Sequence, residues 1–257
     1  MTLQLVDFQL RGQVAVVTGG SRGIGRATAE LLADLGADIV VNYVNNREAA
    51  EEVVEAVRSR GVESFAFKAD VANLAEARQL IQATTARFNR LDMLVCSAGI
   101  WEGAPVEELS EELWDRTLNV NLKGTWAICR EAVSVMKERR SGTIVIVSST
   151  AGQRGEAGYS NYAASKGAQI SFVKSLAAEL AEWKIRVNAV APGWVDTEMT
   201  AEALGGERRR AIARSIPTGS VASPEEIAAP IVFLCTDWAR QITGEVLNVN
   251  GGSVLCG

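Results

Sequence analysis

The sequence predicts an α/β protein: a doubly wound, mostly parallel seven-stranded sheet with helices on both faces. Three observations support this prediction. Short apolar runs rich in β-branched residues alternate with longer helical patterns along the chain. These runs are apolar on both faces, as the strands of a covered parallel sheet are. A glycine-rich turn lies where the first predicted strand passes into the first predicted helix, a junction at which such sheets bind ligands.

Each element is assigned from its own residues. Apolar strands are predicted at residues 14–18, 38–42, 64–69, 92–96, 142–148, 185–191 and 246–249. Helical patterns lie at residues 24–35, 47–60, 74–88, 111–139, 160–183 and 224–236. The first helix is expected to end at Gly36, because glycine favours helix termini. Since crossovers between parallel strands are right-handed, this order of elements gives the Rossmann arrangement.

The chain is predicted to be one domain, residues 1–257, because no Pro/Ser-rich linker or internal repeat divides it. The least regular stretch is residues 193–222, which holds Gly205, Gly206 and Pro217. Loops at the carboxyl ends of strands border the ligand in such folds. We therefore expect this stretch to be a mobile lid over the substrate.

Composition disfavours several classes of function. The 257 residues carry a net charge of −5, which disfavours nucleic-acid binding. Histidine is absent, so the commonest general base and a common metal ligand are missing, and no metal site is predicted. The four cysteines are far apart, and neither a secretory signal nor a membrane-spanning run is visible. These features favour a reduced, cytoplasmic protein without membrane association.

The glycine-rich turn reads Thr18-Gly19-Gly20-Ser21-Arg22-Gly23-Ile24-Gly25. Glycines let the backbone approach a pyrophosphate, and the start of the following helix offers free N–H groups. The turn lacks the Lys-Ser/Thr ending of a nucleotidase phosphate loop. Its place in an N-terminal β-α-β unit therefore predicts a bound dinucleotide.

The end of the second strand bears on the choice between NAD and NADP. NAD enzymes place an Asp or Glu there to bind the adenosine ribose. Here the position is Asn42, so no carboxylate would repel a 2′-phosphate. Arg22 and Arg47 could pair with that phosphate, or both could be solvated surface residues. NADP(H) is the favoured cofactor, with NAD(H) as the alternative.

A second group of residues indicates acid–base chemistry. Tyr162 and Lys166 are four positions apart on one helix and share a face. A free tyrosine has a pKa of about 10, which a nearby ammonium lowers. Ser149, at the end of a strand, could donate a hydrogen bond to a substrate oxygen. A Tyr-x-x-x-Lys pair alone usually reflects a packing tyrosine and a surface lysine, and the combination with Ser149 and the glycine turn makes it specific.

These motifs, in this order, resemble the short-chain dehydrogenase/reductase family. The resemblance rests on the glycine turn, Asp70, Ser149, Tyr162-x-x-x-Lys166 and Pro192-Gly193, and it extends to the closing Asn250-Gly251-Gly252. Within the family the chain is most similar to 3-oxoacyl-[acyl-carrier-protein] reductases and their carbonyl-reductase and sugar-dehydrogenase relatives. The resemblance implies a homotetramer, built through the two longest helices and through the last helix and strand.

The resemblance also implies a role for each matching residue. Tyr162 would donate the proton in reduction, Lys166 would lower its pKa and bind the nicotinamide ribose, and Ser149 would orient the carbonyl. Asn121 would hold a water for proton relay. Asp70 would bind the adenine, and Val195 and Thr197 the carboxamide. The expected cofactor-binding residues are Thr18, Gly19, Ser21, Arg22, Gly23, Ile24, Gly25, Asn42, Asp70, Val71, Ala98, Gly99, Tyr162, Lys166, Pro192, Gly193, Val195 and Thr197.

One motif departs from the family pattern. The usual Asn-Asn-Ala-Gly after the fourth strand is here Cys96-Ser97-Ala98-Gly99. Ala98 and Gly99 still permit close approach to the cofactor, but the loss of both asparagines removes side-chain bonds that brace the sheet. Cys96 could be a redox switch, although a buried strand cysteine usually only packs.

The expected activity is NADPH-dependent reduction of a carbonyl to an alcohol, in a 3-oxoacyl thioester or a related β-keto compound. The alternatives are a general ketone reductase, a glucose-type sugar dehydrogenase or, in a different class, a non-catalytic NADP-binding regulator. Residues expected to border the carbonyl are Trp101, Gln153, Arg154, Tyr159, Trp194 and Met199. An acidic acyl carrier protein, as a partner, would need basic residues such as Arg139, Arg140 and Lys184.

Overall fold

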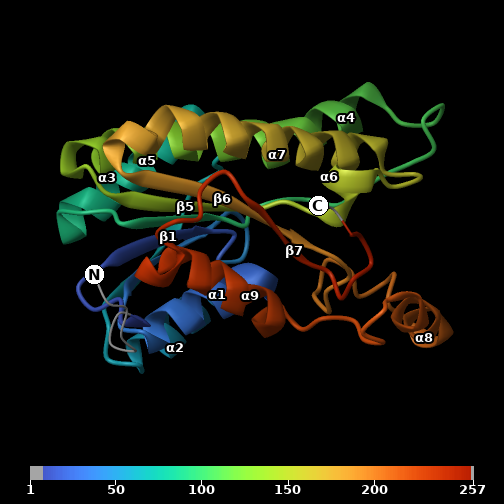
Figure 1. Cartoon of the computed structure of the whole chain (residues 1–257), viewed down its shortest axis with the longest axis horizontal. Coiled ribbons are helices and arrows are strands. Elements are labelled where there is room, and N and C mark those ends of the chain that lie inside the picture. Colours follow the sequence, from blue (N-terminus) through green and yellow to red (C-terminus); the bar gives the residue numbers. More distant parts are fainter. Residues whose placement is uncertain (1–7, 256–257) are drawn as a thin grey trace.

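A computed structural model describes residues 8–255 and has at its centre a sheet of seven parallel strands (Figure 1). The strand order is β3-β2-β1-β4-β5-β6-β7, so the order reverses between β1 and β4. The strands are β1 (Val14–Thr18), β2 (Asp38–Tyr43), β3 (Ser64–Lys68), β4 (Met93–Cys96), β5 (Gly142–Val147), β6 (Ile185–Pro192) and β7 (Val246–Val249). All seven predicted strands are present, and the predicted Rossmann arrangement is confirmed.

Helices cover both faces of the sheet, as Figure 1 shows. One face carries α1 (Gly23–Asp34), α2 (Arg47–Arg58) and α9 (Pro224–Cys235). The other carries α3 (Leu74–Phe88), α5 (Gly124–Arg139) and α7 (Ser160–Leu180). Successive strand residues point to opposite faces, and they therefore divide between two cores. Ala15 and Val17 pack into the first core and Val16 into the second, which explains why the strands are continuously apolar.

The predicted helix at residues 111–139 is present, and a π-helical turn interrupts its α-helical pattern. It divides into α4 (Glu111–Leu118), a π-helical turn η2 (Asn119–Lys123) and α5. Asn121 lies inside this turn, and its side chain forms hydrogen bonds with residues distant in the sequence. A π turn inside a helix often marks a functional site. The predicted helix at 160–183 is α7 followed by a short 3-10 turn, η3 (Ala181–Trp183).

The stretch at residues 193–222 contains two features that the sequence did not predict. A helix, α8 (Gly206–Ser215), projects from the body of the molecule and buries none of its residues. Its polar, Arg-rich sequence has no apolar stripe, and this is why periodicity did not reveal it. Val195 also pairs with Ala222 in an isolated bridge, which joins the two ends of the stretch. The lid role of these residues stays a prediction.

A short helix, α6 (Thr150–Arg154), follows β5, and a 3-10 turn, η4 (Asp237–Ala239), follows α9. Within residues 8–255, no helix is long and apolar enough to cross a membrane.

Three of the four cysteines lie in the described part of the chain, and each is buried and forms no disulfide: Cys96, Cys129 and Cys235. Cys256 lies outside the described residues. The Sγ atoms of Cys96 and Cys129 are 3.8 Å apart. Their mutual hydrogen bond, with burial, raises the pKa of Cys129, which disfavours a reactive thiolate.

Candidate active site

The glycine-rich turn leaves β1 at the point where the strand order reverses, beside the end of β4. The hydroxyl of Thr18 joins the two segments, because it accepts hydrogen bonds from the backbone of Ser97 and Ala98 at 3.1 and 3.2 Å. Gly19 has a φ of 62°, and a Cβ there would lie 2.9 Å from the Cα of Ala98. Only glycine fits at this crossing, which is the crevice where open α/β sheets bind ligands.

The start of α1 fits a pyrophosphate. A Cβ at Gly25 would lie 2.3 Å from the carbonyl oxygen of Gly19, so the helix can begin this close to the turn only with glycine. In the described chain, the N-cap Arg22 makes no side-chain capping bond, and the first turn has no acidic residue. The first N–H groups of α1 and its positive dipole end are therefore available to an anion. This cradle brings together Gly19, Ser21, Arg22, Gly23, Ile24 and Gly25.

The residues expected near the adenosine are placed at the ends of β2 and β3. Asn42 is 1% exposed, and its amide donates to the carbonyl of Ala69 at 2.9 Å. Asn42 therefore braces β2 against the chain that follows β3. Asp70 is exposed, and its carboxylate accepts from the backbone of Ala72 at 2.9 Å. The neighbouring Val71 packs beside Gly124, at the start of α5.

Two exposed arginines flank the crevice. Arg22 precedes α1, and Arg47 begins α2, where its Nε lies 3.6 Å from Glu51. An exposed ion pair of this length contributes little to stability and leaves the Arg47 guanidinium free to reorient. No acidic side chain follows Asn42 before Glu48. The local charge is therefore compatible with a 2′-phosphate.

Ser149 and Tyr162 meet at the carboxyl end of β5. Ser149 caps α6, and its hydroxyl oxygen accepts from the backbone of Ala151 at 3.1 Å. Burial raises the pKa of Tyr162 to about 12, while the hydrogen bond with Ser149 lowers it and the charge of Glu156 raises it. The phenol therefore holds its proton at neutral pH. The net shift of the Tyr162 pKa is upward because desolvation is its largest cause, and the lowering of this pKa by Lys166 stays a prediction.

Lys166 is 5% exposed and lies beneath Tyr162. Its ammonium donates to the carbonyl of Val147 at 2.7 Å, and it lies 5.7 Å from the centre of the Tyr162 ring. Burial lowers the pKa of Lys166 to about 8. A Cβ at Gly152 would lie 2.5 Å from the carbonyl carbon of Lys166, so glycine is what lets α6 lie directly on α7. The Tyr-x-x-x-Lys pair is thereby fixed against the end of β5.

Asn121 holds several parts of the site together. Its side-chain oxygen accepts from the backbone of Ile100 at 2.8 Å, and its nitrogen donates to the carbonyl of Ile100 at 3.0 Å and to the hydroxyl of Ser165 at 3.1 Å. The hydroxyl of Ser165 in turn donates to the carbonyl of Tyr162 at 2.7 Å. Asn121 therefore links the chain after β4 to the helix that carries Tyr162. The water-holding role of Asn121 stays a prediction.

Sequence reasoning missed Gln169, one turn beyond Lys166. It is 1% exposed, and its amide donates to the carbonyl of Asn121 at 2.7 Å and to the hydroxyl of Thr125 at 2.9 Å. Gln169 thus fixes the π-helical turn against α7. A polar residue on the buried face of a long helix was the available signal.

The pocket above Ser149 and Tyr162 has a volume of about 100 Å³. Four of its lining residues were expected from the sequence to border the carbonyl, namely Trp101, Arg154, Trp194 and Met199. Glu156 also lines it and was missed. Gln153 is turned elsewhere, because its amide donates to Asn248 at 2.6 Å. Tyr159 lies behind Trp101, with the two rings stacked at a centroid distance of 4.6 Å.

The segment after β6 returns to the glycine turn. A Cβ at Gly23 would lie 3.3 Å from the Cγ2 atom of Thr197, so Thr197 borders the cradle. Pro192 ends β6, and Val195 is 4% exposed in the segment between Gly193 and Thr197. This placement brings the expected carboxamide-binding residues to the crevice that also holds Ala98, Gly99 and Lys166. A Cβ at Gly99 would lie 3.7 Å from the Lys166 ammonium.

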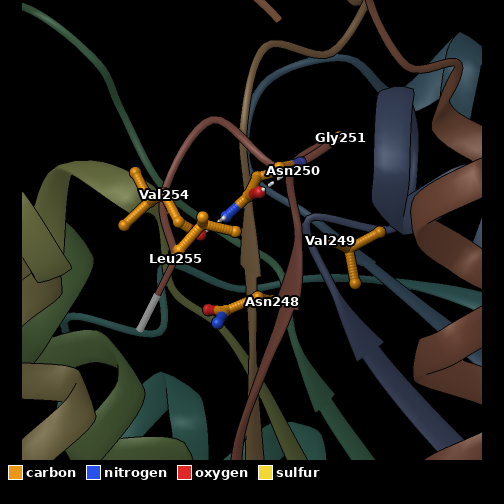
Figure 2. Close-up of a pocket in the computed structure, with 7 residues that line it drawn as sticks. Asn248, Val249, Asn250, Gly251, Val254 and Leu255 are labelled. Atoms are coloured by element: carbon orange, nitrogen blue, oxygen red, sulfur yellow. Dashed lines mark hydrogen bonds between the residues drawn. The ribbon is translucent and has the colours of Figure 1, made fainter. Parts of the chain in front are cut away.

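A larger and more open hollow, about 620 Å³, lies along the C-terminal segment after β7 (Figure 2). It is lined by residues 248–252 with Val254 and Leu255. The amide of Asn250 donates to the carbonyl of Val254 at 3.1 Å, which closes the turn that Figure 2 shows. A Cβ at Gly193 would lie 3.0 Å from Asn250, so this turn supports the segment beneath the smaller pocket. We place the chemistry in the smaller pocket, because Ser149 and Tyr162 line it.

The fold and the crevice define a class of protein, a nucleotide-binding oxidoreductase with a Ser-Tyr-Lys group. The family model described as enoyl-(acyl carrier protein) reductase matches residues 19–253. The chain belongs to the short-chain dehydrogenase/reductase family, whose members use a nicotinamide cofactor.

Curated relatives match the chain over nearly its whole length. A 3-oxoacyl-[acyl-carrier-protein] reductase of Synechocystis is 44% identical over 248 residues, covering 96% of this chain and 98% of the relative. The protein of the same name from Staphylococcus aureus is 41% identical, covering 94% and 98%. An uncharacterized oxidoreductase of Methylorubrum extorquens is also 41% identical, covering 95% and 98%.

Proposed function

We propose that this protein reduces a carbonyl to an alcohol with NADPH, in a 3-oxoacyl thioester or a related β-keto compound. The observation that carries the proposal is the meeting of Ser149 and Tyr162 in one pocket, above the buried Lys166 and beside the glycine cradle. The names of the Synechocystis and Staphylococcus aureus relatives support the thioester substrate.

When bound, the nicotinamide supplies the hydride. Ser149 would donate a hydrogen bond to the substrate oxygen, which orients the carbonyl and draws charge onto that oxygen. Tyr162, which holds its proton at neutral pH, would transfer it to the same oxygen. The charge of Lys166 would stabilise the phenolate as it forms. The indole rings around the pocket would limit access of water.

NADPH is expected to be preferred over NADH. The substitution Arg22→Ala is expected to lower the ratio of kcat/KM with NADPH to kcat/KM with NADH about tenfold or more. The reason is that a charge-assisted contact to the 2′-phosphate contributes about 1.5–3 kcal/mol. The measurement is kcat/KM with each cofactor. Arg26→Ala is the matched control, since Arg26 is exposed on the same helix and pairs with Glu30 at 2.8 Å. Equal kcat/KM with both cofactors in the wild-type protein would contradict the assignment.

The basic residues expected to contact an acyl carrier protein lie far from the pocket along the sheet. Arg139 and Arg140 follow α5 and precede β5, whereas Ser149 follows β5. Six strand residues separate the two ends, or roughly 20 Å at about 3.3 Å per residue. Arg140 also donates to the carbonyl of Glu182 at 2.7 Å and lies 5.1 Å from the centre of the Trp183 ring. An acyl group delivered by a carrier bound at these arginines would therefore have to reach the pocket from the other end of the strand.

A substrate panel tests the proposal. NADPH consumption is measured with acetoacetyl thioesters, with and without acyl carrier protein, and with β-keto esters and simple ketones. NADPH formation is measured with glucose and NADP. We expect efficient reduction of thioesters or β-keto esters. Turnover of simple ketones alone would indicate a general ketone reductase, and glucose oxidation alone a sugar dehydrogenase. Tight NADPH binding without turnover of any compound would indicate a non-catalytic regulator. Homotetrameric assembly and a cytoplasmic location stay predictions.

A further inference from the structure

The pocket of the proposed reductase has a rigid aromatic corner. The Trp101 and Trp194 rings meet edge to face, with centroids 5.8 Å apart and planes at 89°. Both tryptophans line the pocket together with Ser149 and Tyr162. Tyr159 covers Trp101 from behind, at 4.6 Å and with an interplanar angle of 9°. Two indole surfaces are thus held next to the hydroxyls that would bind the carbonyl.

The backbone on both sides of Trp101 is fixed by buried amides. Asn121 bonds both the N–H and the carbonyl of Ile100, at 2.8 and 3.0 Å. The amide of Asn161, which is fully buried, donates to the carbonyl of Glu102 at 3.1 Å. Trp101 therefore lies between two residues whose positions are set by α7 and the π-helical turn.

A glycine lets this segment close over Tyr159. A Cβ at Gly103 would lie 2.2 Å from the carbonyl oxygen of Gly158 and 2.5 Å from the Tyr159 ring. Any other residue at this position would push the segment away and open the stack of Trp101 on Tyr159. The aromatic corner is accordingly a built feature of the pocket, and preorganised walls of this kind select ligands by shape.

The charges beside the corner compensate each other. Burial raises the pKa of Glu156, while a hydrogen bond from Trp101 and the charge of Arg154 lower it. Glu156 and Arg154 line the same pocket, so the two charged side chains of its lining are of opposite sign. The large apolar side chains of the lining are Trp101 and Trp194, with Met199 beside them, and the other lining residues are small or polar.

We propose that the substrate carries an aromatic ring near its carbonyl group, and that this ring packs against Trp101 and Trp194. Aromatic rings prefer offset-stacked or edge-to-face contacts, and each such pair adds to the ordinary burial of apolar area. A saturated chain would gain only the burial. This inference rests on the proposed carbonyl reduction and adds to it the class of the substituent.

Two β-keto esters that differ only in the ring provide the test. One carries a benzyl group on the ketone carbon and the other a cyclohexylmethyl group, so neither ketone is conjugated and the two have similar size. We expect kcat/KM to be roughly fivefold to tenfold higher for the benzyl ester. In Trp101→Leu this ratio is expected to fall close to one, because kcat/KM falls for both esters but further for the benzyl ester, while the affinity for NADPH stays nearly unchanged.

Trp126→Leu is the matched control, since Trp126 is 41% exposed on α5 and is not among the residues that line the pocket. Its ratio is expected to equal that of the wild-type protein. A wild-type ratio of one or less would overturn the aromatic preference and leave the proposed reduction intact. The aromatic preference would also be overturned if an ester with a trimethylammonium arm had a higher kcat/KM than the benzyl ester.

A binding measurement keeps the inference testable if neither ester is reduced, an outcome that would count against the proposed function alone. Quenching of tryptophan fluorescence by each ester is measured in the presence of NADPH. Tighter binding of the benzyl ester, lost in Trp101→Leu, supports the aromatic preference. Equal binding of both esters by the wild-type protein overturns it.

Discussion

Replacing Tyr162 with phenylalanine is expected to lower kcat by roughly 10²–10⁴-fold, while NADPH binds with nearly unchanged affinity. The substitution removes only the hydroxyl that would pass a proton to the substrate oxygen. Its ring remains to fill the space above Lys166. The loss should therefore appear in the transition state and not in the binding of the cofactor. Initial rates of carbonyl reduction and NADPH fluorescence titration measure the two quantities.

Tyr159→Phe is the matched control for this experiment. Tyr159 lies three residues away and stacks on Trp101, and the substitution leaves that stack in place. Its activity should remain close to that of the wild-type protein. If Tyr162→Phe retained most of the wild-type activity, Tyr162 could not be the proton donor, and the assignment of the catalytic group would have to change.

Replacing Lys166 with alanine is expected to lower kcat/KM roughly a hundredfold and to weaken NADPH binding. Lys166 is proposed both to stabilise the Tyr162 phenolate and to bind the nicotinamide ribose, so both quantities should change. Lys174→Ala is the control, because Lys174 is exposed on the same helix. If Lys166→Ala bound NADPH with wild-type affinity, a contact between Lys166 and the nicotinamide ribose would be excluded.

The pH dependence distinguishes Lys166 from Tyr162. Lys166, with a pKa of about 8, is cationic below that pH and neutral above it. Tyr162, with a pKa of about 12, keeps its proton over the same range. The kcat/KM for reduction should therefore fall as the pH rises through about 8, because the ammonium is lost before the phenol ionises. Lys166→Ala should lack this fall. A wild-type profile that stays flat well above pH 8 would mean that the charge of Lys166 is not needed.

Much of the fold could be predicted because it depends on local sequence. Parallel strands are buried on both faces, so runs such as Val14–Thr18 and Gly142–Val147 are recognisable without knowing their neighbours. Gly19 and Gly25 are also recognisable from the local sequence, because they form part of the glycine-rich turn. The structure explains them, since a Cβ at either position would collide with backbone atoms. By contrast, α8 has a sequence without an apolar stripe, and its existence could not be read from periodicity.

The sequence by itself determined the positions of the strands along the chain, the glycine cradle after β1 and the spacing of Tyr162 and Lys166 on one helix, because each depends on residues close together in the chain. Only the tertiary structure decided what surrounds them. The π-helical turn, the bonds of Asn121 to Ile100 and Ser165, and the placing of Trp101 beside Trp194 join segments separated by 21 to 93 residues. The pKa of Tyr162 belongs to the same group, because burial is the largest cause of its upward shift. Such contacts leave no periodic pattern in the sequence, and they shape the pocket that selects the substrate.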